Sequence, residues 1–83
     1  MKVFIIKYYD YTDNKSGISY VYDTLEKAQK MLEVIEQDEI NTQLDNGVDR
    51  ASIYVLKSPL HLEVGIGQDY PYIRYTINER EVE

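Results

Sequence analysis

Eighty-three residues are enough for one domain with a single modest hydrophobic core, and 43% of them are apolar, as in globular proteins. Nine Lys and Arg against fifteen Asp and Glu give a formal net charge of −6. This balance argues against direct binding to nucleic acid or anionic membranes, because both need clustered cations. The absence of cysteine excludes disulfides and thiolate sites. The sequence shows no signal peptide and no apolar stretch of membrane length. Together with the absence of cysteine, this predicts a cytoplasmic protein.

The N-terminal region predicts a β-hairpin. Residues 2–9 carry apolar side chains on both sides of an alternating pattern, which is typical of a central strand. Residues 10–17 are rich in Asp, Asn, Ser and Gly and indicate a turn. Residues 18–22 predict the second strand, so the two strands are joined by a long loop.

A helix is expected to follow the hairpin. Asp23 is the predicted N-cap, because Glu26 three residues later completes a capping box. The helix is predicted to end near Gln37 or Glu39, with a loop over 41–49 that turns at Asn46-Gly47. The apolar stripe of the helix has spacings of three and four residues and consists of Leu25, Ala28, Met31, Leu32 and Ile35.

Three further strands are predicted at residues 51–56, 60–66 and 72–77, with a break at Ser58-Pro59. In the second of these, Leu60, Leu62, Val64 and Ile66 alternate with His61, Glu63 and Gly65, which predicts one buried and one wet face. Residues 78–83 are expected to be a frayed, charged tail. The order β-β-α-β-β-β predicts one α+β domain over residues 1–83, in two layers, with one helix packed on a mostly antiparallel sheet.

The segments Met1–Ile6 and Val21–Ala28 carry a family resemblance. A strand that opens Met-Lys-Val, a polar hairpin and a Tyr-Asp-Thr-x-Glu-Lys-Ala helix start resemble small, uncharacterised bacterial and phage domains. The resemblance covers residues 1–36 and supplies no catalytic residues. It implies a small accessory protein of a phage or prophage.

Six acidic residues and no Lys or Arg lie between Met31 and Asp49. Acids at the C-terminal end of a helix oppose the helix dipole, each at a cost of about 0.3–1 kcal/mol. They are explained as a solvated surface, as a negative surface for a basic partner, or as a site for a divalent metal ion. The spacing of the loop acids lacks the regular pattern of a calcium-binding EF-hand. The candidate partner-binding residues are Glu33, Glu36, Asp38, Glu39, Asp45 and Asp49.

Other features point more weakly to chemistry. His61, the only histidine, would need Ser58, Glu63 or Asp69 within hydrogen-bond reach to form a catalytic site. Gly65-Ile66-Gly67 lacks the third glycine of a phosphate loop and indicates a kink, bulge or turn. An exposed aromatic face is the alternative to packing for four tyrosines, which are Tyr54, Tyr70, Tyr72 and Tyr75.

The sequence therefore predicts a non-enzymatic protein-interaction module with no cofactor or metal. In the specific form of this prediction, the carboxylates imitate nucleic-acid phosphates and occupy the basic surface of a host protein, as a phage-encoded inhibitor or modulator. One alternative is a structural module that forms a homodimer by pairing its last strand across a two-fold axis. The other alternative is a small enzyme that uses His61.

Overall fold

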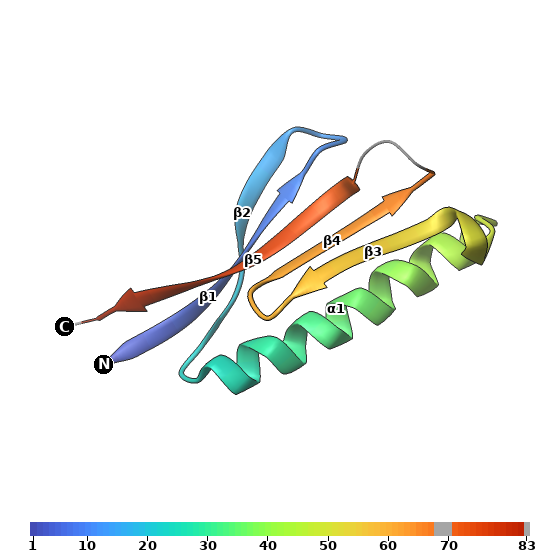
Figure 1. Cartoon of the computed structure of the whole chain (residues 1–83). Helices are drawn as coiled ribbons and strands as arrows, with labels where there is room; N and C mark the ends of the chain where they lie inside the picture. The colour runs from blue at the N-terminus through green and yellow to red at the C-terminus, as the bar shows by residue number, and fades with distance from the viewer. Residues whose placement is uncertain (68–70, 83) are drawn as a thin grey trace.

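The computed structural model has an α+β fold, with one long helix beside a five-stranded sheet in the residues it describes, 1–67 and 71–82 (Figure 1). The predicted order β-β-α-β-β-β is confirmed. The elements are β1 (Lys2–Asp10), β2 (Lys15–Tyr22), α1 (Leu25–Asp45), the single 3₁₀ turn η1 (Arg50–Ser52), β3 (Ile53–Ser58), β4 (His61–Ile66) and β5 (Pro71–Glu81). Among the described helices, none combines the length and apolarity that crossing a membrane requires.

The strand order in the sheet is β2-β1-β5-β4-β3, and every neighbouring pair is antiparallel. The last strand, β5, lies at the centre between β1 and β4, and its residues 73–76 pair with both neighbours, so this part of β5 has no free edge for the predicted dimer. The edges of the sheet are β2 and β3. β5 occupies the centre because its long register with β1 extends from Asp10 opposite Ile73 to Lys2 opposite Glu81.

The core is formed by alternate side chains of the sheet together with the apolar stripe of α1. Three large side chains, Ile6, Leu62 and Val64, are fully buried. Burial of each such side chain contributes about 1.5–3 kcal/mol. The stripe is confirmed by the burial of Ala28, Leu32 and Ile35 and extends one turn further to Ile40. The other buried residues are Ile53, Tyr75 and Ile77.

The helix begins one residue later than predicted. Thr24, not Asp23, is the N-cap, and its Oγ1 accepts a 3.2 Å hydrogen bond from the backbone N–H of Lys27. Thr24 has the extended backbone that an N-cap requires. Asp23 instead accepts a 2.8 Å hydrogen bond from Nζ of Lys27, which lowers the pKa of Asp23.

The helix also ends later than predicted, at Asp45, so the loop predicted over 41–49 is wrong in its first half. Ile40 explains the difference, because it is 5% exposed and continues the packed stripe past Glu39. The turn at Asn46-Gly47 is confirmed. Asn46 is the C-cap, and Gly47 has the left-handed φ of +87° that favours glycine.

The boundaries of β3 and β4 differ slightly from the predicted strands. The segment predicted to start β3 forms η1, because Asp49 Oδ1 accepts a 3.3 Å hydrogen bond from the N–H of Ala51. In β4, Leu62 and Val64 are buried as predicted. Leu60 and Ile66 are 49% and 42% exposed, because they lie at the ends of the pattern beyond the reach of the core.

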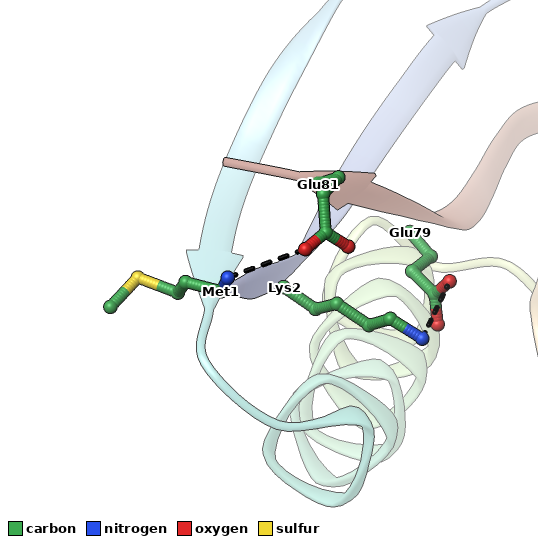
Figure 2. Close-up of polar contacts among 4 residues, drawn as sticks. All are labelled: Met1, Lys2, Glu79 and Glu81. Carbon is green, nitrogen blue, oxygen red and sulfur yellow. Dashed lines mark hydrogen bonds and ion pairs between the residues drawn. The ribbon is translucent and has the colours of Figure 1, made fainter. Parts of the chain in front are cut away.

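The charged tail predicted to fray is instead the end of β5, up to Glu81. Its backbone pairs with the start of β1, and the N–H of Val82 donates a 2.7 Å hydrogen bond to the carbonyl of Met1. Two exposed ion pairs connect the strands, Lys2 Nζ to Glu79 Oε2 at 3.6 Å and the N-terminal ammonium to Glu81 Oε1 at 3.3 Å (Figure 2). Backbone pairing, and not side-chain burial, orders this segment.

Candidate functional site

The six predicted carboxylates divide into two groups according to their contacts. Glu39 belongs to the first group, because both of its oxygens are occupied within the molecule. The hydroxyl of Tyr72 donates to Oε1 and the hydroxyl of Tyr75 donates to Oε2, each over 2.9 Å. The pKa of both phenols lies far above the usual value for tyrosine. Burial is the largest cause, and the hydrogen bond and charge of Glu39 add to it. Glu39 therefore joins α1 to β5.

Glu36 also belongs to the first group. Its side chain is 15% exposed, and Oε1 accepts a 2.9 Å hydrogen bond from Nζ of Lys57 at the end of β3. The hydrogen bond and charge of Glu36 raise the pKa of Lys57. Glu36 thus holds the C-terminal half of α1 against the edge strand β3.

The second group is exposed and consists of Glu33, Asp38, Asp45 and Asp49, which we call the acidic surface. The first three lie on α1 over about 18 Å, at a rise of ~1.5 Å per residue. Asp38 and Asp45, seven residues apart, share one side of the helix, whereas Glu33 lies about 140° from Asp38 around the helix axis, on the side of the β3–β4 turn. The last turn of α1 contains no basic residue. The charge of Asp45, which lies in that turn, thus opposes the helix dipole and lowers helix stability.

A cavity of about 360 Å³ lies between α1 and the turn that joins β3 to β4. Glu33, Glu36 and Lys57 line one part of it, and Ser58 and His61 line another. Gln29 also lines the cavity, and its Nε2 donates a 3.1 Å hydrogen bond to the carbonyl of Pro59. The cavity therefore adjoins the acidic surface at Glu33.

Of the two predicted partners of His61 that the structure describes, only Glu63 contacts it. The imidazole Nε2 lies 3.0 Å from Oε1 of Glu63, two residues along β4. Ser58 faces His61 in the β3–β4 register, but no hydrogen bond joins the two within the described part of the chain. Asp69 lies outside the described residues. Among the described residues, the geometry thus provides a carboxylate that orients an imidazole, and it places no hydroxyl in hydrogen-bond contact with that imidazole.

The three described tyrosines of the predicted aromatic face do not form one exposed surface. Tyr72 and Tyr75 point to Glu39, and Tyr75 is only 8% exposed, so the packing interpretation is confirmed for Tyr75. Tyr54 lies against Gly65, where β4 shifts its register with β5, which confirms the predicted kink or bulge. Tyr70 lies outside the described residues.

A different aromatic cluster, which the sequence did not reveal, lies on the other side of the sheet. The rings of Tyr9 and Tyr11 meet edge to face with centroids 4.8 Å apart. The guanidinium carbon of Arg74 lies 5.7 Å from each centroid. The two tyrosines have strand-like spacing, but only the β1–β5 register, which places Arg74 opposite Tyr9, could have identified their partner.

Comparison of the chain with protein-family models, curated proteins and solved structures gives no significant match. The resemblance of residues 1–36 to phage and bacterial domains therefore stays a prediction. Within the described residues, no three His, Asp or Glu side chains lie together in a way that could hold a metal ion.

Proposed function

We propose that the chain is a non-enzymatic protein-interaction module whose acidic surface binds a basic surface of another protein. The observation that carries the proposal is the exposure of Glu33, Asp38 and Asp45 along one helix that has no compensating base in its last turn. In this proposal the domain has two layers: the helix packs on one face of the sheet, and the outer side of the helix is in solvent.

The division of the carboxylates supports this proposal. Glu36 and Glu39 fix the helix on the sheet, and this rigid support holds the exposed carboxylates at constant spacing. A preformed negative surface accelerates association with a positive partner and suppresses encounters with acidic proteins. Val34, 51% exposed and four residues before Asp38 on the same side of the helix, offers apolar contact area beside Asp38.

The partner is a protein with a cationic groove, such as a nucleic-acid-binding protein of a phage host. Carboxylates along a rigid helix can occupy the same cations that neutralise phosphates. Competition for one set of cations makes the module an inhibitor or modulator of that protein, and binding weakens steeply as salt rises.

The test is capture of partners from a bacterial lysate by the immobilised chain, with the captured proteins identified by mass spectrometry. The variant Glu33→Lys/Asp38→Lys/Asp45→Lys reverses the acidic surface and leaves Glu36 and Glu39 intact. Its matched control, Asp13→Lys/Glu26→Lys/Glu81→Lys, makes the same change in net charge at exposed acids elsewhere.

We expect the wild type and the control to retain one basic protein that the surface variant loses, and duplex DNA to compete with its capture. Equal capture by the surface variant would contradict the proposal. Capture that is lost by both variants would show that net charge alone drives binding, which also contradicts it.

Self-association through β2 is a second candidate, because this edge strand exposes Ile18, Tyr20 and Val21 at 59%, 45% and 54%. An exposed apolar edge favours pairing with another strand. Light scattering at high protein concentration tests this candidate. We expect a dimer that Val21→Lys converts to a monomer, and a wild-type monomer would exclude it.

A further inference from the structure

The two central strands place positive charges on the face of the sheet opposite the core, whereas the chain as a whole is acidic. Successive side chains of a strand point to opposite faces. The residues that alternate with core residues Ile6 and Tyr75 therefore form a second face, which we call the open face. On its two central strands, β1 contributes Lys7 and Tyr9, and β5 contributes Arg74 and Thr76.

A groove of about 440 Å³ lies on the open face, over β1, β2 and β5. Its lining, as far as the described residues form it, contains two cations, Lys7 and Arg74, and no acid, although the whole chain has a net charge of −6. The other polar residues that line it each carry a hydroxyl group and are Tyr8, Tyr9, Ser16 and Thr76. Its volume falls within the usual range for small-ligand sites, about 300–1,000 Å³.

The register brings the two cations close to each other. Tyr9 pairs with Arg74 and Lys7 pairs with Thr76, so Lys7 and Arg74 are diagonal neighbours on adjacent antiparallel strands. Such neighbours lie about 7–8 Å apart at the backbone, a separation that two long side chains can bridge to reach one ligand. Without an anion between them, the two positive charges repel each other.

Neither cation has a charged partner within the described residues. Glu63, opposite Arg74 on β4, lies 3.0 Å from His61 instead. The rings of Tyr9 and Tyr11 hold the guanidinium from one side, and the Tyr9 hydroxyl donates a hydrogen bond to Oδ1 of Asn14. Arg74 is thus fixed by aromatic contacts, and its N–H donors are left for a ligand.

We propose that this groove binds the phosphate group of a small phosphate monoester. Its two positive charges match the dianion, and a guanidinium beside an ammonium provides both directed donors and a compact charge. The hydroxyls of Ser16 and Thr76 supply further donors, and the apolar side chain of Ile18 borders the space for the ester substituent. This site is separate from the acidic surface on α1 and is independent of the function proposed for it.

The test is a two-dimensional NMR titration of the full chain at constant ionic strength, with inorganic phosphate, phenyl phosphate and acetate as probes. We expect saturable shifts at the amides of Lys7, Tyr9 and Arg74 with both phosphates, and binding of phenyl phosphate at least as tight as that of inorganic phosphate. Absence of saturable shifts would overturn the proposal. Acetate binding as tightly as phosphate would overturn the assignment of a dianion.

Substitutions then assign the cations. Lys7→Gln should weaken phosphate binding at least roughly tenfold, the loss expected for one charged hydrogen bond. The matched control Lys30→Gln removes an exposed charge on the helix and should change affinity less than about twofold. Arg74→Gln is a second variant in case Lys7→Gln does not fold. Equal weakening by Lys30→Gln would show that net charge, and not the groove, holds the phosphate.

Discussion

The hydroxyl of Tyr75 donates a 2.9 Å hydrogen bond to Oε2 of Glu39, and this bond connects the central strand of the sheet to the C-terminal half of the helix. Tyr72 donates to the other oxygen of the same carboxylate. One acidic residue thus satisfies two phenols under the helix. The sequence predicts that Glu39 belongs to a partner-binding surface, whereas in the structure its carboxylate binds Tyr72 and Tyr75 within the domain.

Replacement of Glu39 by Ala should destabilise the domain by about 2–3 kcal/mol, because two half-buried hydroxyls lose a charged acceptor. Urea unfolding followed by circular dichroism measures the change. The neighbouring substitution Asp38→Ala is the control, since Asp38 is exposed and its loss should change stability by less than about 0.5 kcal/mol. Equal effects of the two substitutions would show that the tyrosine contacts do not contribute.

The same contacts predict a stability that falls in alkali. The pKa of Tyr72 and Tyr75 in the folded state is raised above the ordinary value of 10.0. Above about pH 10 the unfolded chain therefore releases these protons while the folded chain keeps them, so the stabilisation present below that pH is lost as the pH rises. Urea unfolding at a series of pH values should show the decline, and Tyr75→Phe should make it shallower. A stability that is constant from pH 9 to 11.5 would contradict the raised pKa values.

Local patterns in the sequence predicted the elements, but not the contacts that decide where they end. Apolar periodicity located the helix and all five strands. The polar residues after Glu39 looked like a loop, whereas packing of Ile40 against the sheet extends the helix to Asp45. Likewise, residues 78–81 form a strand because the distant N-terminus pairs with them, and no local signal encodes this pairing.

The functional sites, too, depend on contacts that local sequence patterns do not show. The acidic run is visible in the sequence, but only the contacts with Lys57, Tyr72 and Tyr75 separate its structural members from its exposed ones. The cationic groove was not predicted, because Lys7 and Arg74 are far apart in the chain. They become neighbours through the register of two strands that a sequence pattern does not specify.

The start of the helix provides a third prediction. Thr24→Ala should cost about 1 kcal/mol, because the N–H of Lys27 loses its cap acceptor. Asp23→Ala should cost less, since it removes only an exposed contact with the Lys27 side chain. Thermal unfolding of both variants measures the difference. A larger effect of Asp23→Ala would show that Asp23, and not Thr24, is the N-cap.

The fourth prediction concerns Gly65, where the ring of Tyr54 leaves no room for a side chain. A Cβ added to Gly65 would lie 2.3 Å from Cε1 of Tyr54, which faces it in the β3–β4 register. Gly65→Ala must therefore displace the ring and should destabilise the domain by about 1–3 kcal/mol.

The Tyr54→Ala background isolates this cause, because without the ring Gly65→Ala should be nearly neutral, or stabilising by about 0.4–1 kcal/mol through the reduced entropy of the unfolded chain. Gly47→Ala is the control. Gly47 has a φ of +87° and no atom within 4 Å of an added Cβ, so its substitution strains the backbone equally in both backgrounds. Urea unfolding of the four combinations of Gly65 and Tyr54 gives the coupling directly. A cost of Gly65→Ala that persists without the Tyr54 ring would show that the strand requires glycine for its backbone.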